Sequence, residues 1–241
     1  MDQIARWRVT TMPLVLMYHS VERYDSDPFR VTVSPGRFAR QLGWLARQGL
    51  TGVSMRELLR RHAEGTARGL VGLTFDDGYD DFLGEVVPLL LKHRFTATVF
   101  VVSELLGGHN GWDAGGPRKR LMDEDGVRRA ASLGMEIGSH SAGHRSLAGL
   151  SEAELRHEVT ASKATLERVL GDEVSGFCYP YGHATAREVN AVRAAGYGYA
   201  CAIWRSPLNG RHLLPRTYVG ERDGGLRLSV KRVRHRVRWG R

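Results

Sequence analysis

The chain of 241 residues lacks several features that mark particular protein classes. No run of eighteen or more apolar residues occurs, so the sequence predicts no membrane-spanning helix. Two cysteines, Cys178 and Cys201, are too few for a disulfide framework, and we expect them to be buried free thiols. Residues 1–13 lack the apolar stretch of a signal peptide, which predicts a cytoplasmic protein.

Acidic residues are missing from the last fifteen positions, Arg227 to Arg241, which hold six arginines and one lysine. This segment accounts for seven of the nine formal positive charges, so the rest of the chain is close to neutral. A near-neutral body argues against a nucleic-acid-binding domain, and we expect no specific nucleic-acid partner.

Within this basic segment, Val230, Val233 and Val237 recur at helical spacing. The pattern is typical of an amphipathic helix on a membrane surface, which here would be peripheral contact at the cytosolic face. A disordered basic tail and nonspecific nucleic-acid contact are the alternatives.

Short apolar runs alternate with helical patterns at least six times in the remainder of the chain. This order predicts an α/β domain with parallel strands and right-handed helical crossovers. Ser34, Ser54 and Ser151 begin helical patterns as N-cap residues, and Pro88 interrupts the helix expected over residues 80–94. The expected strands cover residues 14–19, 69–75, 96–102, 135–140, 174–179, 197–203 and 213–219.

Polar residues follow several of these strands. Asp76 and Asp77 end one apolar run, and Gly78 can take the positive φ that a tight turn there needs. His140 and His144 follow another strand, four residues apart. Since parallel strands present their carboxyl ends at one face of a barrel, we expect these side chains to meet.

Two histidines and one aspartate leave an open position on Zn²⁺ or a similar divalent ion, which is a catalytic rather than a structural ligand set. Such an ion acidifies its water and polarises a carbonyl oxygen. A second carboxylate nearby is suited to accept a proton. The alternatives are a solvated Asp-Asp-Gly turn and two unrelated polar histidines.

The order of these motifs resembles a known family. Thr74–Gly78, His140–His144 and Phe177–Gly182 follow one another as in the carbohydrate esterase 4 polysaccharide deacetylases, or NodB-homology domains. Leu16–Val21 and Phe177–Gly182 are most similar to the poly-N-acetylglucosamine deacetylase branch. The resemblance covers about residues 13–220, between an N-terminal extension, 1–12, and a basic C-terminal tail, 221–241. It implies a distorted (β/α)7-type barrel with parallel strands.

The resemblance implies a role for each matching residue. Asp77, His140 and His144 match the ligands of a divalent metal ion, for which zinc is the expected identity. Asp76 matches the general base.

Two further roles concern the transition state. The backbone N–H of Tyr181 matches the donor that stabilises the oxyanion, and Pro180 fixes that turn. His19 occupies the position that supplies the general acid in the poly-N-acetylglucosamine branch, and His212 is the competing candidate.

The chain departs from the common family pattern at Cys178, where many members have an arginine that orients the base. Arg216 is the candidate replacement, and a surface arginine is the alternative. Trp112 is expected to contact sugar from the loop at 107–118, Trp204 to border the site, and Trp44 to lie in the core.

The resemblance implies hydrolytic N-deacetylation of an amino sugar in a polysaccharide or lipid-linked glycan, with release of acetate. One alternative is the same reaction on a small cytosolic acetylated sugar. The other is a non-catalytic glycan- or membrane-binding module, which the intact set of metal-ligand residues disfavours.

Overall fold

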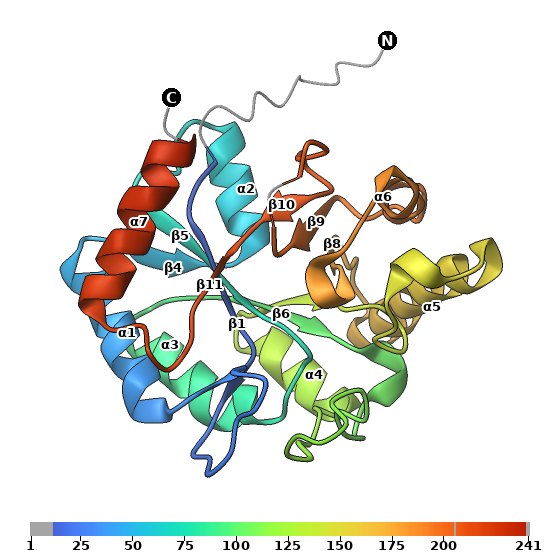
Figure 1. Ribbon diagram of the computed structural model, residues 1–241, viewed down its shortest axis with the longest axis horizontal. Helices are drawn as coiled ribbons and strands as arrows, with labels where there is room; N and C mark the ends of the chain where they lie inside the picture. Colours follow the sequence, from blue (N-terminus) through green and yellow to red (C-terminus); the bar gives the residue numbers. More distant parts are fainter. Residues whose placement is uncertain (1–11, 205, 240–241) are drawn as a thin grey trace.

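The computed structural model describes residues 12–204 and 206–239, with side chains up to residue 237. Parallel strands form a nearly closed barrel in the order β10-β9-β8-β7-β6-β5-β1-β11, with helices around it (Figure 1). This confirms the predicted α/β barrel of the (β/α)7 type. The strands are β1 (Val15–Tyr18), β5 (Leu70–Phe75), β6 (Thr98–Val101), β7 (Glu136–Ser139), β8 (Gly176–Cys178), β9 (Tyr199–Ala202), β10 (Leu214–Pro215) and β11 (Thr217–Tyr218).

One segment closes the barrel by changing partners. Leu214 and Pro215 of β10 pair with β9, whereas Thr217 and Tyr218 of β11 pair with β1. Arg216 lies at the break between the two strands, and its side chain is buried. Outside the barrel path, β4 (Thr51–Val53) extends the sheet beside β5, and β2 (Ser20–Val21) pairs with β3 (Thr32–Val33).

The helices surround the barrel where their sequence signals predicted them. Ser151 and Glu154 form the expected capping box, and the Ser54 hydroxyl accepts a hydrogen bond from the Glu57 N–H. Ser34 precedes its helix but makes no side-chain cap, because its hydroxyl donates to Glu221 instead. The helices are α1 (Pro35–Arg47), α2 (Met55–Ala63), α3 (Val87–Lys92), α4 (Glu124–Ser132), α5 (Glu152–Leu170), α6 (Ala186–Ala194) and α7 (Gly225–Trp239).

Short helical turns connect several of these elements. The helix expected over 80–94 consists of a π-helical turn, η1 (Phe82–Val86), followed directly by α3 with Pro88 in its first turn. Proline has no N–H for the preceding turn, which accounts for the restart there. The 3₁₀ turns are η2 (Ser103–Leu105), η3 (Leu147–Gly149) and η4 (Pro180–Gly182).

The main core lies between the barrel and its surrounding helices. The Phe75 ring stacks on Tyr18, with centroids 5.2 Å apart, and meets Phe38 and Phe82 edge-on. This aromatic cluster packs α1 and η1 against β1 and β5, next to the strand ends that carry the polar residues. Cys178 and Cys201 are buried free thiols, as predicted.

The basic segment forms helix α7 along the outside of the barrel beside α1 (Figure 1). Leu228 is buried, the Gln41 amide donates to the Asp223 carbonyl at 2.8 Å, and His235 Nε2 lies 2.6 Å from the Met12 carbonyl oxygen. Over its described length this segment is therefore helical rather than a disordered tail. Residues 1–11 of the predicted extension lie outside the described residues.

No helix among the described residues is long and apolar enough to cross a membrane.

Candidate active site

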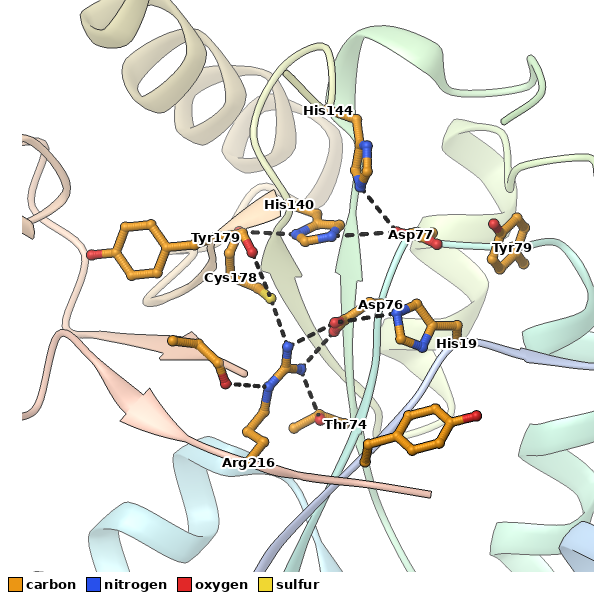
Figure 2. A network of polar contacts seen from close by, with 12 residues as sticks. His19, Thr74, Asp76, Asp77, Tyr79, His140, His144, Cys178, Tyr179 and Arg216 are labelled. Carbon is orange, nitrogen blue, oxygen red and sulfur yellow. Dashed lines mark hydrogen bonds and ion pairs between the residues drawn. The ribbon is translucent and has the colours of Figure 1, made fainter. Parts of the chain in front are cut away.

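The predicted polar residues meet at the carboxyl ends of the strands (Figure 2). Asp76 and Asp77 directly follow β5, and His140 directly follows β7. His19 lies between β1 and β2, and Arg216 enters from the closing segment. The site is thus assembled from strands far apart in sequence.

An unusual backbone conformation directs these side chains into one cleft. Gly78 has the predicted positive φ, 73°, and Asp77 itself has a φ of 75°. His144 and Tyr181 also lie in the left-handed region, at 58° and 59°. For residues with a side chain this conformation costs of order 1–3 kcal/mol each and often marks a functional site. At Asp77 it breaks the alternation of the strand, so that neighbouring carboxylates point into the same cleft.

Three buried side chains form a donor set for a cation. His140 Nε2 lies 3.3 Å from Asp77 Oδ1, and His144 Nε2 lies 3.4 Å from the same oxygen. One ligand atom from each residue falls within 4.8 Å of the other two. Burial favours the neutral acid, but the two neighbouring imidazoles hold the pKa of Asp77 well below its usual range.

The orientation of the imidazoles suits metal binding. His140 Nδ1 lies 2.9 Å from the Cys178 carbonyl oxygen, which can only accept, so Nδ1 carries a proton and Nε2 is the atom left for a metal ion. Burial lowers the pKa of His140, but the nearby carboxylates of Asp77 and Asp76 help to raise it well above its ordinary value, so a metal ion at Nε2 would replace a proton there. Burial lowers the pKa of His144, which favours its neutral ring. Two imidazole lone pairs and a carboxylate oxygen that converge in a buried cleft fit a divalent ion, and zinc accepts this ligand set.

Glu158, which no sequence motif indicated, holds the loop that carries both histidines. Its Oε2 accepts hydrogen bonds from the Ala142 N–H at 3.0 Å and the Gly143 N–H at 2.8 Å. Glu158 is buried on the face of α5 that also carries Leu155 and Val159. A glutamate on an apolar helical face is the signal that would have revealed it.

We expect Glu158→Leu to weaken the binding of a divalent metal ion, measured with zinc, by about 10–100-fold. The Gly143 N–H would lose its acceptor, and the Ala142 N–H would keep only the backbone carbonyl of residue 158. Titration of the metal-free protein against a competing chelator measures this. Glu158→Gln is the matched control, since it keeps an acceptor oxygen and is expected to bind zinc more tightly than the leucine variant. Zinc affinity unchanged in Glu158→Leu would show that the loop needs no such support.

The second carboxylate, Asp76, is held by Arg216. The guanidinium donates from Nη1 to Oδ1 at 2.6 Å and from Nη2 to Oδ2 at 2.7 Å, a bidentate ion pair inside the barrel. Its Nη1 also donates to Thr74 Oγ1, and its Nε donates to the Ala202 carbonyl. Burial favours the neutral acid, yet the Arg216 charge and hydrogen bonds keep the pKa of Asp76 below its ordinary value.

Arg216 also contacts the residue that replaces the family arginine. Its Nη2 lies 3.1 Å from Cys178 Sγ, and burial raises the pKa of that thiol, so the sulfur is neutral. A small neutral side chain at Cys178 leaves room for the guanidinium that arrives from the closing segment. The alternative of a surface arginine is wrong, because the Arg216 side chain is fully buried.

His19 lies on the other side of Asp76, with its Nε2 3.9 Å from Asp76 Oδ2 (Figure 2). The chain after it is fixed by Asp81, which accepts hydrogen bonds from Ser20 Oγ at 2.6 Å and the Val21 N–H at 3.1 Å. His212, the competing candidate, does not reach the site. Its Nε2 lies 2.7 Å from the Tyr197 carbonyl oxygen, which precedes the start of β9.

A solvent-open groove of about 730 Å³ leads to His144. Trp112, as predicted from its loop, lies at this mouth and stacks on the His144 ring with centroids 4.1 Å apart. Tyr181, in turn η4 behind Pro180, contacts the same imidazole edge-on at 5.0 Å. Trp204 is largely exposed and does not line this groove.

Trp44 lies in the main core, as predicted.

Together, the barrel and its cluster of carboxylates and imidazoles define a hydrolase site at the carboxyl ends of parallel strands. The sequence model described as "Polysaccharide deacetylase" matches residues 63–200, more than half of the chain, and the chain belongs to that family. It is an enzyme of the polysaccharide deacetylase type, an amide hydrolase acting on N-acetyl groups. The family predicted from the motifs is confirmed.

Relatives and solved structures agree with this assignment. The "Putative polysaccharide deacetylase YxkH" of Bacillus subtilis is 26% identical over 81% of this chain and 67% of its own length. A poly-beta-1,6-N-acetyl-D-glucosamine N-deacetylase of Staphylococcus aureus is 21% identical over 79% of this chain and 68% of its own length. The Streptococcus pyogenes deacetylase PplD shares the fold, with a TM-score of 0.78, 22% identity and coverage of 92% of this chain and 98% of its own.

Proposed function

We propose that the protein hydrolyses the N-acetyl group of an amino sugar within a polysaccharide or a lipid-linked glycan and releases acetate. The observation that carries this proposal is the placement of an ionised, arginine-paired carboxylate, Asp76, beside the donor set of Asp77, His140 and His144. Relatives named as polysaccharide N-deacetylases support the reaction class.

The ligand set would hold a divalent ion, with zinc as the expected metal. When bound, such an ion polarises the acetyl carbonyl and makes water more acidic. Asp76 takes the proton of the attacking water, and the bidentate bonds from Arg216 keep its carboxylate ionised and aligned. The backbone N–H of Tyr181 donates to the carbonyl oxygen as negative charge develops on it.

Collapse of the tetrahedral carbon requires a proton on nitrogen, because an amine anion is a poor leaving group. His19 is the residue proposed to supply it, from the side of Asp76 opposite Arg216. Cleavage of the carbon–nitrogen bond then yields acetate and the free amino sugar. The open groove beside Trp112 and His144 offers space for sugar units next to the reacting residue.

The test is a screen for acetate release with three substrate classes: oligomers of N-acetylglucosamine, nucleotide sugars and small N-acetyl amino sugars. We expect oligomers to be hydrolysed fastest and metal-stripped enzyme to be inactive until zinc is restored. His140→Ala is the matched control, because zinc addition is not expected to rescue it. Faster hydrolysis of the small sugars would favour the cytosolic alternative, and no acetate from any substrate would overturn the reaction.

His19→Gln is expected to lower turnover by about 10²–10⁴-fold, the usual contribution of a positioned acid. Zinc affinity should be unchanged, because the metal is assigned to other residues. Rate measurements and a zinc titration on the same preparation separate the two effects. Loss of zinc binding in this variant would instead make His19 a ligand.

A further inference from the structure

Helix α7 exposes a continuous row of aliphatic side chains. Leu226, Val230, Val233 and Val237 are spaced by four, three and four residues, which places them on one side of the helix. Their exposed fractions are 82%, 59%, 58% and 68%. Leu228, on the opposite side, is 2% exposed and attaches the helix to the barrel. The row thus remains exposed although α7 is packed against the barrel. A contiguous exposed apolar face of this kind indicates an interaction surface.

Basic side chains flank this row. Arg227 and Arg234 fall on one side of it by helical spacing and Arg236 falls on the other, and all three are exposed. In the described part of the chain, none of the three forms an ion pair with a carboxylate. No acidic residue occurs after Asp223, so the helix itself carries only positive charges around its apolar centre.

A groove of about 750 Å³ extends this face toward the loop between β2 and β3. Arg227 and Arg234 line it from α7, and Arg30 lines it from the loop. Three carboxylates also line it. Asp223 pairs with Lys231 at 2.6 Å, Glu221 pairs with Arg37 at 3.7 Å, and Asp27 accepts from two backbone N–H groups of its own loop. The groove therefore carries a net positive charge, because its basic side chains outnumber these carboxylates.

We propose that this face of α7 docks onto a lipid bilayer that contains anionic phospholipids, with the aliphatic row inserted between headgroups and the arginines on their phosphates. A second copy of the chain fits less well, because Arg227, Arg234 and Arg236 would face the same charges. A nucleic acid would satisfy the arginines but leave the aliphatic row against a phosphate backbone. Of these three occupants, the anionic bilayer alone matches both the apolar centre and the basic borders.

The position of α7 relates this surface to the site. The helix follows β11, which pairs with β1, and the site residue His19 follows the carboxyl end of β1. The first turn of α7 therefore lies at the end of the barrel that carries the site (Figure 1). Docking through this face suits a substrate that is itself held at a membrane, although the docking does not depend on the reaction catalysed.

Flotation of the full chain with vesicles tests the proposal. One set contains phosphatidylcholine alone, and the other contains roughly one third phosphatidylglycerol. We expect strong preference for the anionic vesicles. Val230→Gln/Val233→Gln/Val237→Gln should bind them at least about tenfold more weakly, and Arg227→Gln/Arg234→Gln about thirtyfold more weakly. Acetate release from a soluble oligomer should be unchanged in both variants, which also reports that they are folded.

Control variants carry substitutions of the same kind on other helices. Arg129→Gln/Arg156→Gln removes two exposed arginines from α4 and α5, and Leu91→Gln removes an exposed leucine from α3. Both controls should bind anionic vesicles like the unmodified chain. Equal binding by the α7 variants, or no binding by the unmodified chain, would overturn the proposal. A concentration-dependent dimer in light scattering that the valine substitutions abolish would assign the face to a second copy instead.

Discussion

Asp76→Asn is expected to reduce deacetylase turnover by about 10²–10⁴-fold, because the amide that replaces the carboxylate cannot accept the proton of the attacking water. The substitution preserves shape, so the loss should appear in kcat rather than in substrate affinity. Steady-state acetate release from an N-acetylglucosamine oligomer measures both quantities.

Zinc affinity should be retained in this variant, since the ligand set uses the neighbouring carboxylate, Asp77. Asp80→Asn is the matched control: Asp80 is an exposed carboxylate four residues after Asp76, and its loss should leave turnover unchanged. If Asp76→Asn retained near-normal turnover, the general base would have to be assigned elsewhere.

Arg216→Met is expected to lower the free energy of unfolding by about 3–5 kcal/mol, the typical cost of leaving one partner of a buried ion pair uncompensated. Asp76 would remain buried without its two charge-assisted hydrogen bonds. Turnover should fall as well, because the base would lose both its alignment and its stabilised negative charge. Urea denaturation and acetate release provide the two measurements.

The double variant Arg216→Met/Asp76→Asn separates stability from catalysis. Removal of both charges should recover part of the lost stability, while turnover stays low because the base is absent. Arg216→Lys should not restore full activity, because a single ammonium cannot make the fork of bonds to both carboxylate oxygens. A loss of less than about 0.5 kcal/mol in Arg216→Met would resemble a surface substitution and would contradict the buried pair.

The Asp76–Arg216 pair supplies the positive charge that orients the base, although the motif position where many family members carry an arginine is Cys178 here. Cys178 provides no charge beside the base. The guanidinium comes instead from Arg216, which lies 140 positions after Asp76 in the sequence. Arg216 is located where the closing segment passes from pairing with β9 to pairing with β1. Leu214, two residues earlier, packs with Cys178 and Cys201, so ordinary strand alternation points the Arg216 side chain into the barrel as well.

Much of the fold could be predicted from local patterns. Apolar runs of strand length and capped helical patterns alternate, and parallel pairing with right-handed crossovers follows from that order. The same order brings Asp77, His140 and His144 to one face, because each follows the carboxyl end of a parallel strand or lies in the loop after it. The candidate metal ligands were therefore predictable before any contact was known.

Supporting residues were harder to predict, because their partners are remote in sequence. Glu158 lies among apolar residues of α5, and its role as an acceptor for the loop is evident only when the His140–His144 loop packs against that helix. Likewise, the family resemblance left both His19 and His212 as candidates for the acid. Only the register of β10 on β9 shows that His212 belongs at the amino end of that strand.

The sequence by itself determined the barrel, the motif residues and the amphipathic character of the C-terminal helix, because these depend on residue order and local periodicity. The tertiary structure alone decided which arginine pairs with Asp76 and which face of α7 is buried. Periodicity reveals that a helix has an apolar side but not whether the protein covers it. Here Leu228 is buried against the barrel, and the row from Leu226 to Val237 remains exposed, because packing selects a face by the shape of its neighbours.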